Sequence, residues 1–480
     1  MTDDRTHGSG DAVDVVVIGG GVAGLAVAHD LARAGVRVVL LEAADELGGL
    51  LRRGRVAGID IDLGAESFAT RTDAVARLVA DAGLPLDLVR PQPGGAALVL
   101  ADPSGAGGVT RGPLPRRTVL GIPADPLAAD VVALIGAEAA ARAARERDRP
   151  AFDAATTPEP SLFDLVAERL GAVVAERLVD TLCRSIYSRA ARAARLSELH
   201  PGLWAAFCAT GHLTDAAAQL AADAPAGSAV GGIAGGMWQL PLALARAAQT
   251  HGAVLRTGVA ARAITGEDGA FVVDTTDGPL GARRVVVATG ARAAAALRPS
   301  APGADGAAAD AGVVRLVAAA VDRPDLPALP VGSGVIVDAA VPSAAKALTQ
   351  ITAKWAWARA AAPAGRHLVR LSARDASPGA SVLDLDTPAA FAREVTLLTG
   401  VPIAAAEVVD VVVQEWRDAV PGAAPDDDVR ADAARGIHHT GAAVAGTGLA
   451  SVLPHARALA ARLADELAHS HPVHPTRSHA

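Results

Sequence analysis

The chain has 480 residues, of which 51% are hydrophobic and only 2% are aromatic, and its formal net charge at pH 7 is −8. A chain of this length is expected to form two or three domains with sizeable hydrophobic cores. The negative charge, with no Lys- or Arg-dense run, excludes nucleic acid as the main partner.

The ends of the chain and its cysteines indicate where the protein works. Residues 1–11 are polar and acidic, unlike a signal peptide, and residues 469–480 are rich in His and Pro, so we expect both segments to be disordered tails. No apolar run is long enough to span a membrane. Cys183 and Cys208 have neither a disulfide nor a metal-ligand spacing. We therefore predict a cytoplasmic protein without a metal site, and peripheral membrane contact stays open.

The strongest local signal lies near the start of the chain. Residues 13–18 form a short apolar run, typical of a strand buried on both faces, and Gly19, Gly21 and Gly24 follow in the spacing GxGxxG where a helical pattern begins. In a dinucleotide fold these glycines allow a tight turn, approach of the pyrophosphate and close helix–strand packing. A second apolar run ends at Glu42, whose carboxylate can accept hydrogen bonds from ribose hydroxyls. Together these features predict a dinucleotide site at the helix N-terminus.

Three further segments indicate which dinucleotide is bound. Paired glycines follow Glu42, a later apolar run ends in Ala-Thr-Gly, and three glycines precede an amphipathic helix near the end of the chain. This pattern resembles the glutathione-reductase-like FAD folds. No second GxGxxG follows an apolar run, so we expect no nicotinamide domain, and electrons should pass from an organic substrate through FAD to O2. The residues that the resemblance assigns to FAD are Gly19, Gly21, Val22, Ala23, Gly24, Glu42, Gly48, Gly49, Arg52, Gly64, Ala65, Val259, Ala288, Thr289, Gly290, Gly441, Gly446, Gly448 and Leu449.

The order of these motifs predicts an α/β protein. The FAD motifs occur at both ends and in the middle, so the glutathione-reductase-like Rossmann domain is expected to be assembled from residues 12–90, 226–300 and 430–468. Helical periodicity dominates much of 91–225, and strand patterns dominate 301–429. We expect these two segments to form a substrate domain with a helical subdomain and a mixed sheet.

Two helix starts and one strand pattern in the substrate domain can be specified further. Ser161 is expected to cap a helix, and another helix should start after Thr387, where Pro occupies the first position. The run ALTQITAKWAW, 347–357, has a strand pattern. Its alternation would put Trp355 and Trp357 on one face, favoured as core, and Lys354 on the opposite face.

A more specific resemblance is carried by five segments spread over nearly the whole chain. They are GPLPRRTVLGIPADP (112–126), SIYSRAA (185–191), GGMWQLPLALA (235–245), KWAW (354–357) and TGAAVAGTGLASVL (440–453). With them the chain resembles the FAD-dependent protoporphyrinogen/coproporphyrinogen III oxidases of haem biosynthesis, of the actinobacterial type, within the amine-oxidase-like flavoprotein superfamily. The glycine motif alone would fit amine oxidases and carotenoid desaturases equally well.

The resemblance implies a reaction and a few candidate residues. A porphyrinogen would lose six electrons to become a porphyrin, with FAD as acceptor and O2 reoxidising it to give H2O2. Hydride would pass from a methylene bridge to flavin N5, so no side chain is named as catalytic. Arg116, Arg117 or Lys354 would meet the substrate propionates, and Tyr187 is a further active-site candidate. A solvated loop for the arginine pair, a solvent-facing charge for Lys354 and a buried structural hydroxyl for Tyr187 stay open.

Three functions stay open from the sequence. The first is oxidation of coproporphyrinogen III, with protoporphyrinogen IX as the other substrate. The second is a diverged flavin oxidase that acts on an amine or another electron-rich ring. The third is a catalytically idle FAD-binding paralogue that holds a porphyrin or a haem-pathway enzyme as partner. The oligomeric state stays open as well.

Overall fold

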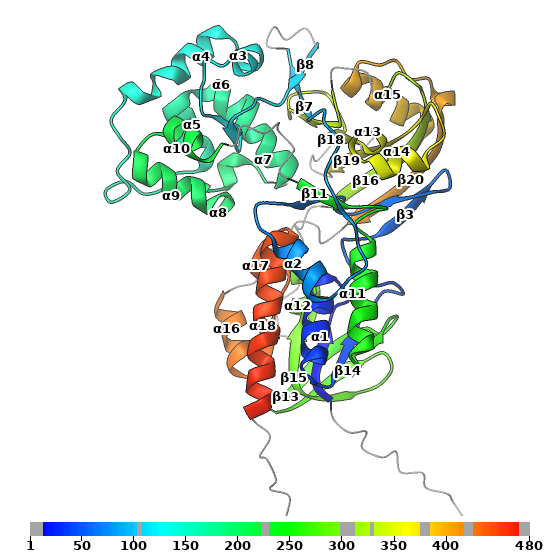
Figure 1. The fold of residues 1–480 in the computed structure, drawn as a ribbon. Coiled ribbons are helices and arrows are strands. Elements are labelled where there is room, and N and C mark those ends of the chain that lie inside the picture. Colours follow the sequence, from blue (N-terminus) through cyan, green and yellow to red (C-terminus); the bar gives the residue numbers. More distant parts are fainter. Residues whose placement is uncertain are drawn as a thin grey trace, which may run out of the picture.

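The structure is a computed structural model (Figure 1) that describes residues 13–102, 108–187, 189–221, 230–267, 269–297, 313–326, 331–374, 385–416 and 426–469. The expected tails lie outside these residues, except for His469, which ends the last helix. Within the described ranges, no helix is both long and apolar enough to cross a membrane. Figure 1 shows a lower part that combines the first and last described segments, an upper left part made of helices, and an upper right part built on a second sheet.

The lower part is built around a seven-stranded sheet, here called the first sheet. In pairing order its strands are β12 (Val254–Arg256), β2 (Val38–Leu41), β1 (Val13–Ile18), β15 (Leu280–Val287), β14 (Ala270–Thr275) and β13 (Ala261–Glu267), and β21 (Ile437–His439) also pairs with β15. The pairs β12–β2, β2–β1, β1–β15 and β15–β21 are parallel, whereas β13, β14 and β15 form an antiparallel meander. The parallel arrangement gathers the carboxyl ends of β1, β2 and β21 at one edge.

Both faces of the first sheet are covered, which explains the continuous apolar runs of its central strands. Val15 and Val17 pack on helices on one face, whereas Val16 packs with Phe271 of the meander on the other. The helices on the first face are α1 (Val22–Arg33), α2 (Ala74–Asp81), α11 (Gln239–Thr250) and α18 (Leu449–His469). Shorter helices of the same part are α12 (Ala291–Ala296), α16 (Asp426–Ala434) and α17 (Ala442–Ala445).

The upper left part, here called the helical part, contains short helices around their own core. They are α3 (Ala129–Ile135), α4 (Ala137–Ala144), α5 (Leu162–Leu170), α6 (Ala172–Val174), α7 (Thr181–Ile186), α8 (Leu196–Leu199), α9 (Pro201–Thr210) and α10 (Leu213–Leu220). The periodic runs are interrupted at Gly136 and Gly171, whose φ angles of +83° and +104° are incompatible with a continuing helix. Ser161 caps α5 as predicted, because its Oγ accepts a hydrogen bond from the Asp164 N–H at 3.1 Å.

The upper right part contains the second sheet, which is mixed, as predicted. In pairing order its strands are β20 (Val408–Trp416), β16 (Val314–Asp322), β19 (Arg366–Arg374), β18 (Ala345–Gln350), β17 (Gly334–Val337), β7 (Ala97–Ala101) and β8 (Val109–Pro113). Only the β17–β7 pair is parallel among these described strands. α15 (Pro388–Thr399) packs on the sheet and is capped by Thr387, as predicted. β7 and β8 come from the start of the segment that was assigned to the helical subdomain.

Short strands lie between the two large sheets. They are the hairpin β3 (Arg53–Val56) and β4 (Ile59–Asp62), and the trio β5 (Phe68–Ala69), β11 (Val230–Ile233) and β6 (Leu88–Val89). A further pair, β9 (Thr118–Val119) and β10 (Ile122–Pro123), packs in the core of the helical part. Val56 and Ile61 of the hairpin pack with residues of β16 and β19. The hairpin therefore ties the first-sheet part of the chain to the second sheet.

The prediction that the strand continues through residues 351–357 is wrong. β18 ends at Gln350, and the chain then forms α13 (Ile351–Lys354) and α14 (Ala356–Ala361), since an Ala-rich run favours helix once it leaves the sheet. Trp355 is 1% exposed and packs on Gly232, so its expected core role is confirmed. The prediction that Lys354 lies on the face opposite Trp355 is also wrong, because the Lys354 Nζ is 5.2 Å from the centroid of the Trp355 ring.

Candidate active site

The GxGxxG turn between β1 and α1 has the geometry that a dinucleotide requires. Gly19 has φ +111°, in the region that favours glycine. A Cβ at Gly24 would lie 2.0 Å from the Gly19 carbonyl oxygen, so only glycine allows the helix to pack this closely on the strand. A Cβ at Gly21 would meet no atom within 4 Å. The backbone at Gly21 is therefore accessible to a phosphate group in front of the first turn of α1.

Glu42 is held in place beside this turn. Its Oε2 accepts a hydrogen bond from the Gly20 N–H at 2.7 Å, and its Oε1 accepts one from the Ala44 N–H at 2.8 Å. The Glu42 carbonyl oxygen accepts a further bond from the Val259 N–H at 2.9 Å. Each carboxylate oxygen keeps a free lone pair, which suits the ribose role predicted for this residue.

Segments that are far apart in the sequence meet at the turn. A Cβ at Gly19 would lie 2.8 Å from the Ala288 carbonyl oxygen and 3.1 Å from the Thr289 side chain. A Cβ at Gly441 would lie 3.7 Å from Ala23 in α1 and 3.8 Å from the same Ala288 oxygen. Two of the predicted glycine-containing segments, 288–290 and 441–448, thus reach the first one.

The other predicted FAD residues are distributed around this centre. Gly48 donates to the Gly20 carbonyl at 2.9 Å, and a Cβ at Gly49 would be 3.2 Å from the Gly21 Cα.

Gly446 and Gly448 have positive φ angles just before α18, which begins at Leu449, and a Cβ there would meet no atom within 4 Å. Gly290 caps α12, and Val22 begins α1. The Arg52 side chain, unlike these glycines, is not part of the turn: it is 41% exposed, and its Nη2 lies 3.7 Å from the Glu46 Oε2.

Residues 62–66, here called the 62–66 loop, connect this centre to the second sheet. A Cβ at Gly64 would lie only 1.8 Å from the Leu50 carbonyl oxygen, which also accepts a hydrogen bond from the Ala65 N–H at 2.9 Å. Glu66 is almost fully buried, and its Oε1 accepts a hydrogen bond from Lys354 Nζ at 2.6 Å. Arg370 Nη2 lies 3.2 Å from the other Glu66 oxygen. One carboxylate thus faces two cations. Arg370 comes from β19 of the second sheet, and Lys354 ends α13, the helix that follows β18.

Two carboxyl groups of this loop have pKa values shifted in opposite directions. Burial raises the pKa of Asp62 to about 7, although its carboxylate accepts hydrogen bonds from the Met237 and Trp238 N–H groups, both at 2.9 Å. Burial alone would also raise the pKa of Glu66, but the charges of Arg370 and Lys354 outweigh burial and lower it to about 2. Paired carboxyls with separated pKa values are typical of functional sites.

The four predicted substrate residues are not gathered into one cluster. Lys354 is 15% exposed and already paired with Glu66. Arg116 and Arg117 lie on the exposed turn between β8 and β9, where the Arg116 N–H donates to Asp130. Tyr187 is half-buried at the end of α7, and burial raises the pKa of its hydroxyl.

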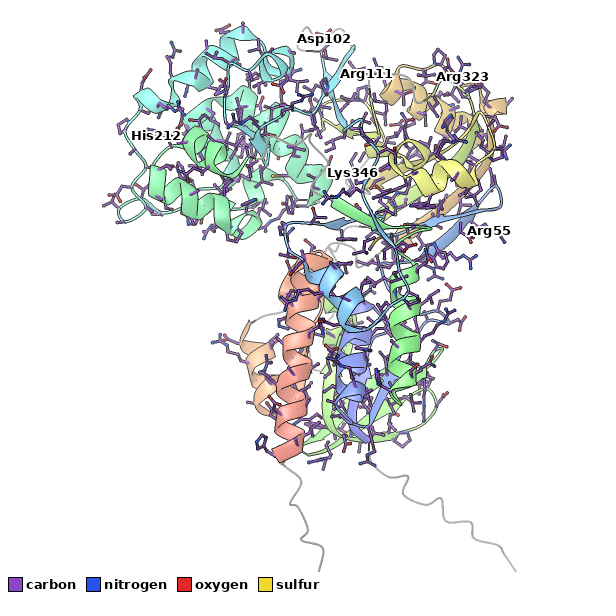
Figure 2. The ribbon with its side chains drawn as sticks, viewed as in Figure 1. Arg55, Asp102, Arg111, His212, Arg323 and Lys346 are labelled. Carbon is purple, nitrogen blue, oxygen red and sulfur yellow. The ribbon has the colours of Figure 1, made fainter. Side chains whose placement is uncertain are left out.

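Tyr187 lies close to the junction between the helical part and the second sheet. The Ser185 hydroxyl donates to the Lys346 carbonyl at 2.9 Å, and Figure 2 shows Lys346 at this junction. Lys346 is near the start of β18, whereas Lys354 follows the end of the same strand. Ser185 and Lys354 therefore lie near opposite ends of one strand of the second sheet.

The sequence interpretation missed Asp62, Glu66 and Arg370. Two signals could have indicated them. The strand pattern HLVRLSAR places Arg370 between the apolar residues Val369 and Leu371, and the acidic stretch GIDIDLGAESF follows the paired glycines. A charged residue in an apolar strand predicts a buried partner.

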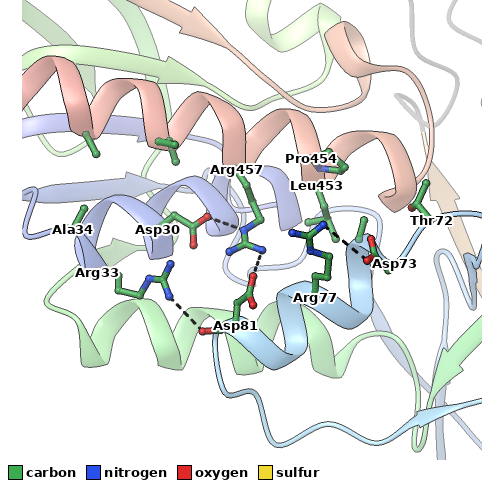
Figure 3. Close-up of a pocket in the computed structure, with 14 residues that line it drawn as sticks. Asp30, Arg33, Ala34, Thr72, Asp73, Arg77, Asp81, Leu453, Pro454 and Arg457 are labelled. Atoms are coloured by element: carbon green, nitrogen blue, oxygen red, sulfur yellow. Dashed lines mark hydrogen bonds and ion pairs between the residues drawn. The ribbon is translucent and has the colours of Figure 1, made fainter.

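A groove on the outer side of α1, α2 and α18 lies apart from these residues (Figure 3). Arg457 donates to Asp30 at 2.9 Å and to Asp81 at 2.8 Å, and Arg33 donates to the Asp81 carbonyl at 3.4 Å. The charges that line the groove thus pair with one another. We interpret it as a salt-bridged junction between helices.

With this geometry established, comparison with known proteins defines the class. Residues 22–466 match the family described as flavin containing amine oxidoreductase, and the chain belongs to this family. It is an FAD-dependent oxidoreductase. It is 32% identical to the coproporphyrinogen III oxidase of Mycobacterium tuberculosis over 439 residues, which cover 90% of this chain and 92% of that protein. It is 31% identical to the coproporphyrinogen III oxidase of Mycobacterium leprae over 418 residues, 85% of this chain and 88% of that one. The resemblance to the porphyrinogen oxidases is confirmed.

Solved structures confirm the predicted fold class. A crystal structure from Exiguobacterium sp. 255-15, assigned as a protoporphyrinogen oxidase, superposes with a TM-score of 0.76 at 22% identity and covers 96% of this chain and 100% of that one. Putrescine oxidase bound to putrescine superposes with a TM-score of 0.62 at 15% identity, covering 95% and 99%. At such identities these likenesses describe the fold.

Proposed function

We propose that the protein oxidises a porphyrinogen to the porphyrin in haem biosynthesis, with coproporphyrinogen III favoured over protoporphyrinogen IX and with O2 as the electron acceptor that yields H2O2. The observation that carries the proposal is the similarity to the mycobacterial coproporphyrinogen III oxidases over nine-tenths of both chains. The match to the putrescine oxidase of Kocuria rosea covers only 18% of the chain, which makes an amine the weaker alternative.

The described residues fit the cofactor that this reaction needs. The first turn of α1 and the accessible backbone at Gly21 would hold the pyrophosphate, and Glu42 would hold the ribose. When bound, FAD supplies the hydride acceptor. The protein orients the macrocycle and excludes water, and Arg116, Arg117, Lys354 and Tyr187 remain our proposed substrate residues. Cations suit the propionates because a charged hydrogen bond to a carboxylate is stronger than a neutral one.

The test is oxidation of coproporphyrinogen III by the purified, FAD-loaded protein. Under air we expect porphyrin fluorescence to rise together with H2O2, and without O2 we expect the substrate to bleach the flavin absorbance. Protoporphyrinogen IX and putrescine, assayed in parallel, serve as competing substrates.

Each outcome of this assay has a defined meaning. Faster bleaching by coproporphyrinogen III than by protoporphyrinogen IX supports the stated preference. A flavin that no porphyrinogen bleaches would refute the proposal. Bleaching by putrescine would then favour an amine oxidase, and absence of bleaching by any of the three would favour an idle paralogue.

A further inference from the structure

We infer that Arg370 is a positioning residue for the flavin, because it fixes the 62–66 loop against the second sheet with Glu66 as its counter-ion. The inference rests on the FAD contact that the family resemblance assigns to Gly64 and Ala65, and it does not depend on the identity of the substrate. No contact of Arg370 with substrate is invoked.

The evidence begins with the contacts that Arg370 makes. From β19 its Nη1 donates to the Asp62 carbonyl at 3.1 Å and to the Gly64 carbonyl at 2.7 Å, while Nη2 lies 3.2 Å from Glu66. The Arg370 and Glu66 side chains are 11% and 10% exposed, so water screens these contacts little. One guanidinium thus binds three positions of a five-residue loop.

A second residue of the same sheet makes the same kind of contact. Trp416, the last residue of β20, donates its indole N–H to the Leu63 carbonyl at 2.8 Å. The carbonyls of Asp62, Leu63 and Gly64 therefore all accept hydrogen bonds from side chains of the second sheet. A loop whose successive carbonyls are bound by a separate sheet has its backbone position set by that sheet.

The other side of the loop is fixed as well. The Asp62 carboxylate accepts the Met237 and Trp238 N–H groups just before α11. Gly64 has no space for a side chain against Leu50. The loop is thus held between α11 and the second sheet, and loss of Arg370 would leave the Trp416 bond as the remaining contact described here on the side of the second sheet.

The charges around the loop add an electrostatic effect. Lys354 and Arg370 contribute two positive charges and Glu66 one negative charge, so the net charge beside the Gly64–Ala65 backbone is +1 below the pKa of Asp62, which is about 7. A fixed positive charge in a poorly screened site favours electron uptake by a nearby group. Removal of Arg370 should therefore lower the midpoint potential of bound FAD.

Arg366 offers a matched control on the same strand. It lies four residues from Arg370, so both side chains point to the same face of β19. Its guanidinium is also held by a carboxylate, with Nε and Nη2 donating to Asp322 at 2.6 and 2.8 Å. Asp322 belongs to the adjacent strand β16, so this pair stays within the second sheet.

The experiment compares Arg370→Gln, Arg370→Lys, Trp416→Phe and Arg366→Gln in the full chain. The measurements are the dissociation constant of FAD, the visible absorbance spectrum of the bound flavin and its midpoint potential. For Arg370→Gln we expect FAD affinity to fall at least about tenfold, because hydrogen bonds from a charged group contribute that much. The spectrum should also shift and the potential should fall.

The other variants separate geometry from charge. Arg370→Lys should restore the potential toward wild type but not the affinity, since an ammonium group does not reproduce the planar fork of donors. Trp416→Phe should weaken FAD binding less than Arg370→Gln, and Arg366→Gln should leave all three quantities unchanged.

Two results would overturn the inference. One is wild-type FAD affinity, spectrum and potential in Arg370→Gln or, if that variant does not fold, wild-type affinity in a folded Arg370→Lys. The other is an equal change in Arg366→Gln, which would assign the effect to the sheet in general. Because every measurement uses FAD alone, failure of coproporphyrinogen III as a substrate would refute the proposed function without affecting this test.

Discussion

Among the described residues, two arginine–carboxylate centres that are at most 11% exposed have the same chemistry and different surroundings. In the helical part, Glu146 Oε1 accepts from Arg169 Nε at 2.9 Å and from Nη2 at 2.7 Å, and both side chains are buried. At the junction of the two sheets, Glu66 pairs with Arg370 and Lys354. The first centre lies wholly within one part of the fold, whereas the second joins two parts.

The two centres also differ in the other contacts that Glu146 and Glu66 make. Glu146 also accepts from the Leu213 N–H at 3.0 Å and the Thr214 hydroxyl at 2.8 Å, so one anion satisfies one guanidinium and the start of α10. Around Glu66 two cations face one carboxylate, and Arg370 also donates to carbonyls of the 62–66 loop. We infer that the closed centre stabilises the fold, whereas the centre at Glu66 influences the flavin site through the loop that carries the proposed FAD contacts of Gly64 and Ala65. The predictions below test this distinction.

The largest effect is expected at the closed centre. Arg169→Met leaves the buried Glu146 carboxylate without its cation, and breaking a buried pair in this way typically costs about 3–5 kcal/mol of unfolding free energy. Chemical denaturation of the FAD-loaded protein measures the loss. The visible spectrum and midpoint potential of the flavin should stay at wild-type values, because this centre lies within the helical part.

Arg149→Met is the matched control for this variant. Arg149 forms an exposed ion pair with Glu168 at 3.2 Å, a type of pair that contributes about 0–1 kcal/mol. Equal losses in Arg169→Met and Arg149→Met would contradict the assigned role of the buried centre. A shifted flavin spectrum in Arg169→Met would contradict the distinction between the two centres.

The second prediction uses the pKa of Asp62, which burial raises to about 7. A carboxyl whose folded-state pKa is raised contributes stability that is fully present below its unfolded value of about 4 and is lost as pH rises to about 7. Asp62→Asn cannot ionise and should lack this loss. The unfolding free energy of the variant minus that of wild type should therefore increase by a few kcal/mol between about pH 4 and pH 7 and then level off.

Glu66→Gln provides the control of opposite sign. The pKa of Glu66 is lowered to about 2, so its contribution is present above its unfolded value, about 4, and is lost as pH falls through 2. In denaturation series at pH 4, 5.5, 7 and 8, the difference should therefore rise for Asp62→Asn and stay flat for Glu66→Gln, whose change lies below pH 4. A flat difference for Asp62→Asn across this range would show that Asp62 titrates normally in the folded protein.

The features that the sequence predicted well depend on neighbouring residues. The strand, turn, helix and acid between residues 13 and 42 are one local unit, and the glycine spacing specifies its backbone directly. The caps at Ser161 and Thr387 were predictable for the same reason, because each bonds to a backbone N–H three residues away.

The features that the sequence did not reveal depend on distant contacts. Glu66 and Arg370 come together only through the fold, and no local pattern pairs them. Lys354 was placed on the wrong side of Trp355 because alternation holds only while the backbone stays in the sheet, and here it leaves at Gln350. The repeat of apolar residues predicts side-chain direction within a helix or strand, but tertiary packing decides where that helix or strand ends.

The smallest predicted effect belongs to the helix that carries Arg169. Ser161 Oγ accepts the Asp164 N–H at the start of α5, and Ser161→Ala should cost about 1 kcal/mol of unfolding free energy, whereas Ser161→Asp should cost little because Asp is also a good N-cap. Arg169 lies eight residues on, about 12 Å along the helix axis. The losses of Ser161→Ala and Arg169→Met should therefore add to within about 0.5 kcal/mol in the double variant. A double variant that loses clearly less than the sum would mean that α5 frays once its cap is gone, so that the buried pair depends on the cap and the closed centre extends along the whole helix.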